Sequence, residues 1–151
     1  MNDSSDVVIE RTLDAPIDLV WKMWADPEHF KAWYGPTGAR IPVAQWDLSV
    51  GASRLVSMEM DTPDGPMQMW FAGEFREVVA NQRLVYTESM SDETGAVADP
   101  DQATEVIVEL EDLGGTTKMV MTHVGVPADS PGGAGWNMAL DKLVDYVGTQ
   151  A

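Results

Sequence analysis

Residues 41–124 form one long segment in which apolar and polar residues alternate with a period of two, as they do in β-strands. Short breaks rich in Gly, Pro, Asp and Asn divide the segment, for example Pro63-Asp64-Gly65-Pro66 and Gly114-Gly115. Strands joined by such breaks pair as antiparallel hairpins. The predicted strands are residues 42–48, 53–60, 67–78, 84–89, 103–110 and 118–124. The acidic segment 91–102 is predicted to be a surface loop.

The C-terminal stretch, residues 131–149, carries apolar residues at the spacing of one face of an α-helix. Ser130 and Pro131 suit the N-cap and the first helical position, although the glycines of the following turn should leave it loose. A single amphipathic helix after a run of strands has to lie on the sheet. The predicted buried face consists of Trp136, Leu140, Leu143, Val144 and Val147.

One strand and two short helices are predicted before this sheet. Residues 7–13 are strand-like. Pro16 and Pro27 each suit the first position of a helix, and Asp26 can cap the helix that begins at Pro27. Trp21 and Trp24 have the spacing of core residues. We therefore expect residues 1–151 to form a single α+β domain, in which a seven-stranded antiparallel sheet curves around the C-terminal helix. Residues 1–6 are expected to be disordered or extended.

Composition excludes several classes of function. The net charge of −16 and the scattering of the nine basic residues oppose phosphate backbones and anionic lipid surfaces, so we expect neither a nucleic-acid partner nor a membrane partner. The absence of cysteine excludes disulfides, thiolate nucleophiles and cysteine-bound metals. There is no apolar run long enough to span a membrane and no signal-peptide pattern, so the cytoplasm is the expected location.

Motifs along most of the chain match one family in order and spacing. These are ERTLDAPIDLVWKMWADPEHFKAWYGP, WDLSVGA, MDTPDG, FAGEFREVVANQRLVYT, THVG and GWNMALDKLVDYV. With them the chain closely resembles the family named for the activator of the heat-shock-protein-90 ATPase, within the START-like (SRPBCC, helix-grip) superfamily. Gly51-Ala52 is a departure, because the family usually has a Gly-Gly pair there.

The resemblance implies a helix-grip fold with a cavity between the sheet and the long helix. Such cavities take apolar small molecules and in some members catalyse their conversion, so the implied partner is an apolar ligand. A homodimer is a second partner that the resemblance favours, and Trp70 and Met138 are candidate patch residues. The resemblance gives only weak support for chaperone binding, because in the protein after which the family is named a separate domain engages the chaperone.

Methionine and aromatic residues are the candidates for the cavity wall. Six methionines lie on predicted strands, in pairs two residues apart that face one side. Flexible, polarisable methionine suits either an irregular core or a soft-walled pocket, and both readings stay open. The predicted ligand-binding residues are Trp33, Tyr34, Trp46, Met58, Met69, Phe71, Tyr86, Met121, His123, Trp136 and Leu140.

Few polar residues occupy the alternate strand positions whose side chains are predicted to face inward. His123 could orient a carbonyl or act as a general base, or it could be a hydrogen-bonded core histidine. Arg54, if inward, needs a partner such as Glu88, and Tyr86 offers an inward hydroxyl. These residues are the candidates for an enzyme of cyclase, dehydratase or hydrolase type. His29 is expected to be exposed and far from His123, so no metal site and no cofactor is predicted.

Overall fold

A seven-stranded antiparallel sheet curls around three helices in the computed structural model, which describes residues 6–97, 99, 103–126 and 130–150. The strands are β1 (Asp6–Leu13), β2 (Arg40–Trp46), β3 (Ser53–Thr62), β4 (Gly65–Val79), β5 (Arg83–Ser91), β6 (Thr104–Asp112) and β7 (Thr117–Val124). The helices are α1 (Ile17–Ala25), α2 (Pro27–Trp33) and α3 (Pro131–Gln150). The predicted fold class is confirmed.

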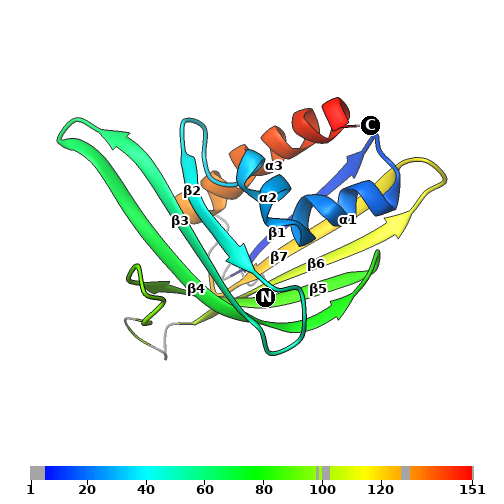
Figure 1. The fold of residues 1–151 in the computed structure, drawn as a ribbon. Helices are drawn as coiled ribbons and strands as arrows, with labels where there is room; N and C mark the ends of the chain where they lie inside the picture. The colour runs from blue at the N-terminus through cyan, green and yellow to red at the C-terminus, as the bar shows by residue number, and fades with distance from the viewer. Residues whose placement is uncertain (1–5, 98, 100–102, 127–129, 151) are drawn as a thin grey trace, which may run out of the picture.

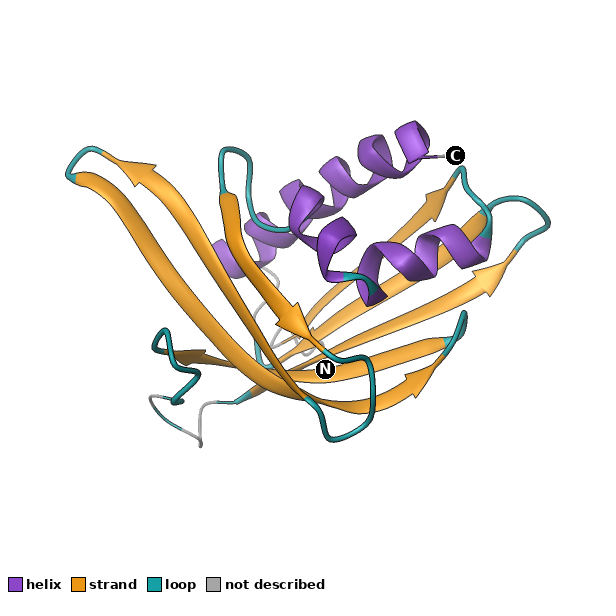
Figure 2. Cartoon of the chain, viewed as in Figure 1, coloured by secondary structure: helices purple, strands orange, loops and turns teal. Residues whose placement is uncertain are grey.

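The strand order is β1-β7-β6-β5-β4-β3-β2, so β1 and β2 are the two edges. All three helices lie on the concave side of the sheet (Figure 2), where α3 packs against β1, α1 and α2. No helix of the described residues is both long and apolar enough to cross a membrane. Residues 1–5 of the predicted disordered or extended N-terminus lie outside the described residues, and Asp6 already belongs to β1.

β3 and β4 form a hairpin that extends well beyond the helices (Figure 1). β2 pairs with β3 as far as Glu59, and β5 pairs with β4 only from Trp70 onward. In the outer part of the hairpin, up to the Thr62–Gly65 pair at its tip, the two strands therefore pair only with each other among the described residues. Arg40 of β2 also reaches this outer part, where its guanidinium forms an ion pair with Asp61 at 3.0 Å.

The sheet bends sharply where β4 passes β5. A side-chain carbon at Gly73 would overlap the carbonyl oxygen of Thr87, so only glycine fits this approach. Glu74 donates its backbone N–H to Oγ1 of Thr87 at 3.0 Å, in place of a ladder bond. A register shift follows between Phe75 and Glu77. The bend turns the inner face of β4 toward the helices.

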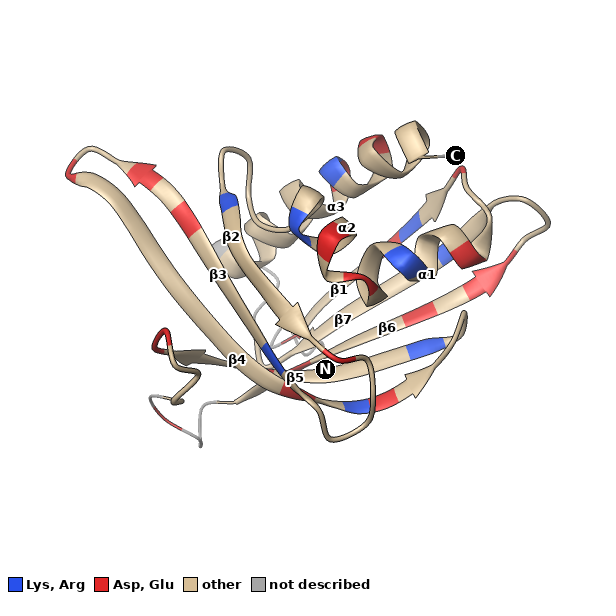
Figure 3. Cartoon of the chain, in the orientation of Figure 1, with Lys and Arg blue, Asp and Glu red and all other residues tan. Residues whose placement is uncertain are grey.

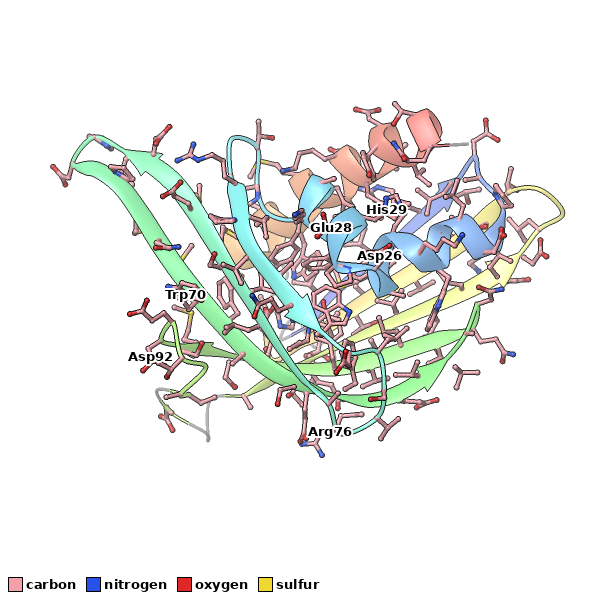
Figure 4. All side chains as sticks on the ribbon, viewed as in Figure 1. Asp26, Glu28, His29, Trp70, Arg76 and Asp92 are labelled. Carbon is pink, nitrogen blue, oxygen red and sulfur yellow. The ribbon has the colours of Figure 1, made fainter. Side chains whose placement is uncertain are left out.

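α1 begins one residue later than predicted. Pro16 is extended, with ψ 154°, and is the N-cap of a helix that starts at Ile17. The turn between α1 and α2 follows the prediction, because the Asp26 carboxylate accepts a 2.9 Å hydrogen bond from the N–H of Glu28. Figure 4 labels both residues at this junction.

The predicted exposure of His29 is wrong. This residue is half-buried, and its Nδ1 lies 2.8 Å from the hydroxyl of Tyr146 on α3 (Figure 4). Sequence periodicity places a residue on a face of its own helix but does not say which other helix covers that face. Here α3 crosses α2, so His29 becomes a contact between them.

The buried face of α3 differs from the prediction at one residue. Trp136, Leu140, Leu143 and Val147 are buried as predicted, but Val144 is 37% exposed. Ala139 is buried in addition. At about 100° per residue, Ala139 extends the buried arc on one side, whereas Val144 falls about 40° beyond Leu140 on the other.

Candidate functional site

A cavity of about 620 Å³ lies between the first half of α3 and the inner face of β3 and β4. Its wall combines the small residues of the α3 entry, methionines of the hairpin, and the turn that follows α2. Among the described residues that line the cavity, three carry titratable groups: Tyr34, Glu88 and His123. Concave, largely apolar sites with a few convergent polar groups are typical of small-molecule binding.

The turn after α2 closes one side of this cavity. Tyr34 is extended and ends α2, and Gly35 adopts φ +88°, which L side chains rarely adopt. Lys142 on α3 donates to the carbonyl oxygens of Tyr34 at 3.4 Å and of Pro36 at 3.3 Å. Burial lowers the pKa of Lys142. These bonds fasten the turn to α3 beside the cavity.

The methionine pairs divide between cavity and core. Met58, Met60 and Met69 line the cavity, whereas Met119 and Met121 are fully buried in the core. Methionines of this pattern therefore lie both in the cavity wall and in the core, on different strands. Met67 is 46% exposed toward the tip of the hairpin and does not line the cavity.

Arg54 and Glu88 form a buried ion pair beneath the cavity. Arg54 is 2% exposed, and its Nη1 lies 3.5 Å from Oε2 of Glu88, which confirms the predicted partner. The guanidinium carbon lies 3.8 Å from the ring centroid of Tyr86, and Trp46 and Phe30 present their rings at 5.0 and 5.3 Å. Cation–π contacts of this kind stabilise a desolvated guanidinium.

His123 is held at both ring nitrogens. Trp136 donates its indole N–H to Nδ1 at 2.8 Å, so Nδ1 carries no proton. Nε2 lies 2.7 Å from Oγ1 of Thr104, whose hydroxyl donates onward to the carbonyl oxygen of Glu88 at 2.9 Å. The arrangement assigns the proton of the neutral ring to Nε2. Burial lowers the pKa of His123, opposed by the carboxylate of Glu88.

Two phenols adjoin the ion pair. Tyr34 donates its hydroxyl to Oε2 of Glu88 at 3.3 Å. Burial, and then the charge of Glu88, raise the pKa of Tyr34 well above its ordinary value, and burial likewise raises the pKa of Tyr86. Both phenols are therefore neutral at physiological pH. The Tyr86 hydroxyl and Nε of Arg54 are buried without a hydrogen-bond partner among the described residues.

The structure brings some of the predicted ligand-binding residues into the cavity wall and places others elsewhere. Those in the wall are Tyr34, Met58, Met69, Phe71, His123 and Trp136. Trp33 and Trp46 instead direct their indole N–H groups to carbonyl oxygens of α1, at Met23 and Ala25. Tyr86, Met121 and Leu140 are buried in the core and do not line the cavity.

Sequence reasoning missed the residues that make room for the cavity. Gly132, Ala134, Gly135 and Ala139 of α3 all line it, and their short side chains leave the space that larger residues would fill. The glycine-rich start of the helix was the available signal. Met138, a candidate patch residue, also lines the cavity. Its partial exposure therefore belongs to the cavity mouth.

A second, larger hollow of about 1010 Å³ lies mainly on the outer face of the sheet. Its floor includes Leu55 and Ala72, which alternate with inward-facing residues of β3 and β4. Asp47 and Glu74 stand at its sides, so it is more polar than the inner cavity. Trp70, a candidate patch residue, also points to this outer side (Figure 4). The inner cavity, unlike this outer groove, lies between α3 and the sheet.

Charged residues are dispersed over strands and helices, and Figure 3 shows no clustering of basic residues. Within the part of the chain that the structure describes, no three His, Asp or Glu side chains gather as metal ligands would.

Comparison with known proteins gives a family and a shared fold. The model of a family described as Activator of Hsp90 ATPase homolog 1-like protein matches residues 14–148. A crystal structure from Nitrosomonas europaea is 22% identical, with TM-score 0.81 and coverage of 100% of this chain and 99% of that one. One from Chromobacterium violaceum is 22% identical, with TM-score 0.77 and coverage of 93% and 96%.

The AHSA1 protein of Silicibacter pomeroyi is 18% identical, with TM-score 0.72 and coverage of 97% of this chain and 99% of that chain. No curated protein matches the chain. At these identities the solved structures establish the fold alone.

Proposed function

We propose that this chain, which belongs to the Activator of Hsp90 ATPase homolog 1-like family, binds an apolar small molecule between α3 and the β3–β4 hairpin. The observation that carries the proposal is the cavity of about 620 Å³, with its wall of methionine, aromatic and small residues. A volume of this size is within the range of ordinary ligand pockets, about 300–1,000 Å³.

The methionines favour a ligand-binding reading. Met58, Met60, Met69 and Met138 reach the cavity from three different elements. Their unbranched side chains adapt to ligands of different shape at low cost. A wall of this kind suits an apolar molecule that is recognised more by volume than by many directed hydrogen bonds.

The geometry at His123 favours binding over catalysis. A general base needs a free lone pair within reach of the proton that it removes. In His123 the lone pair of Nδ1 accepts from Trp136, and the proton of Nε2 is directed to Thr104. Of the other predicted acid–base candidates, Arg54 and Tyr86 do not line the cavity, whereas Glu88 lines it and is ion-paired with Arg54.

Filling the cavity tests the proposal directly. Ala139 is 1% exposed and lines the cavity, so Ala139→Phe should place a ring in the ligand space. We expect Nile red and 1-decanol to stabilise the natural protein in thermal unfolding, and Ala139→Phe to abolish that stabilisation. A bound ligand stabilises the native state in proportion to the logarithm of its concentration over its Kd.

Val144→Phe is the matched control, because it adds the same ring to an exposed position of the same helix. This variant should keep the ligand-induced stabilisation. The proposal fails if neither probe stabilises the natural protein, or if the two variants respond alike although both are folded by circular dichroism.

Dimer formation and chaperone binding stay predictions from the family resemblance. Members of this family typically bind small molecules or act as co-chaperones. No contact in the described part of the chain points to a partner protein, and Met138 is accounted for by the cavity mouth. Sedimentation at high protein concentration tests the dimer, and stimulation of the chaperone's ATPase tests the co-chaperone role.

A further inference from the structure

The carboxylate of Glu88 has one oxygen engaged and one oxygen free. Oε2 is 3.3 Å from the hydroxyl of Tyr34 and 3.5 Å from Nη1 of Arg54. Oε1 accepts no hydrogen bond from any described residue, and Nε2 of His123 is 4.0 Å away. Glu88 is only 6% exposed, yet it lines the cavity. Glu88 therefore brings to the cavity wall a carboxylate in which one oxygen has no hydrogen-bond partner among the described residues.

The hydrogen-bond donors of the cavity wall are already committed. Tyr34, His123 and Trp136 are the lining residues whose side chains carry an N–H or O–H group. Tyr34 donates to Glu88, Trp136 donates to His123, and Nε2–H of His123 is directed to Thr104. Among the described side chains, the wall thus offers a ligand one acceptor and no donor.

The charge of the site is also balanced without a ligand. Arg54 neutralises Glu88 from beneath and is not part of the cavity wall. A ligand carboxylate would meet the free oxygen of Glu88 as a like charge, and none of the described lining residues is a lysine or an arginine. A ligand ammonium would add a second buried cation to a pair that is already neutral. Both cases bury an uncompensated charge, which is costly.

We propose that the ligand carries a neutral hydroxyl group on an apolar skeleton and donates it to Oε1 of Glu88. This assignment rests on the proposed cavity function and specifies the chemical class of its ligand as an alcohol or a phenol. Hydrogen bonds to charged acceptors are stronger than those between neutral groups. The free carboxylate oxygen would therefore select hydroxyl-bearing molecules over hydrocarbons, ethers and acids of the same shape.

A matched set of naphthalene derivatives tests this assignment on the natural protein. The set consists of naphthalene, 2-naphthol, 2-naphthalenemethanol, 2-methoxynaphthalene, 2-naphthoate and 2-naphthylmethylammonium, each titrated by isothermal calorimetry at pH 7. The two hydroxyl compounds should bind at least about tenfold more tightly than the methoxy compound and the hydrocarbon. They should also bind more tightly than both charged compounds. The two hydroxyl compounds distinguish a phenol from an alcohol.

A charge-balanced variant tests the role of Glu88 itself. Arg54→Met together with Glu88→Leu removes the acceptor without leaving an unpaired buried charge. This double variant should bind naphthalene and lose the preference for 2-naphthol over 2-methoxynaphthalene. If all members bind the natural protein equally, or if 2-naphthoate binds most tightly, the hydroxyl assignment is overturned and the cavity function stands. If no member binds, the cavity function itself is overturned.

Discussion

The indole nitrogen of Trp136 lies 2.8 Å from Nδ1 of His123, and this hydrogen bond determines the tautomer of the imidazole. An indole N–H can only donate, so the facing ring nitrogen has to accept. Protonation of His123 at Nδ1 would place two N–H groups against each other inside the protein. The ring is therefore held in its neutral form by geometry as well as by burial.

Stability should depend on the protonation of His123. Burial lowers the pKa of His123 in the native state, so the unfolded chain takes up a proton first as the pH falls. Stability is thus fully present above about pH 6.5, the ordinary histidine pKa, and is lost below it until the lowered native pKa is reached. The slope is at most about 1.4 kcal/mol per pH unit, measurable by urea unfolding between pH 7.5 and pH 5.5.

His123→Asn should flatten this slope, because the amide oxygen can accept from Trp136 and does not titrate in this range. His29→Asn, measured in parallel, separates any contribution of the other histidine. An unchanged slope in His123→Asn would contradict the assignment.

Removing Arg54 should be strongly destabilising. Arg54→Met leaves Glu88 as an unpaired charge in a site where both side chains are less than a tenth exposed. Breaking a buried pair from one side typically costs about 3–5 kcal/mol. Adding Glu88→Leu should recover a large part of that loss, because the second charge is then also absent. Denaturant unfolding of both single variants and the double variant gives the coupling energy. Additive losses would show that the pair is not coupled.

Gly35 and Gly38 provide a matched test of the turn beside the cavity. Both have positive φ, +88° and +91°, so alanine at either position should cost about 1–2 kcal/mol in backbone strain. At Gly35 the added carbon would also lie 3.0 Å from Cβ of Ala39 and 3.2 Å from Cε of Met58, whereas Gly38 has open space. Gly35→Ala should therefore lose more stability than Gly38→Ala and should also weaken Nile red binding. Equal losses would show that the crowding is relieved.

Gly135→Ala should stabilise the protein by about 0.5–1 kcal/mol, because alanine is the better helix former and its side chain would meet nothing within 4 Å. Gly132→Ala is the contrasting variant, since its added carbon would lie 2.8 Å from Cγ1 of Val126. Thermal unfolding compares the two.

Periodicity along the chain was sufficient to predict the fold. The period of two predicted six of the seven strands, residues 7–13 were predicted as the seventh, and strand parity suggested Glu88 as the partner of Arg54. Both inferences need only the alternation of a strand, which is a local property. The same reasoning placed Met69 and Phe71 on the face that lines the cavity.

Whether a residue on that face lines the cavity or lies in the core could not be predicted in the same way. Met121 has the correct parity but lies in the core, on β7 between Ile9 of β1 and Val108 of β6. The hydrogen bonds of His123 depend on the register that pairs Thr104 with Glu88. A pattern read along one strand contains no information about its offset from the next strand.

The chain of bonds from Trp136 through His123 and Thr104 to the backbone of Glu88 joins α3 to β7, β6 and β5. Moving the start of α3 away from the sheet would break this series of hydrogen bonds and leave its buried polar groups without partners. None of these bonds involves the outer part of the β3–β4 hairpin, whose two strands pair only with each other among the described residues. We therefore expect a ligand to enter and leave the cavity on the hairpin side, with the start of α3 held in place.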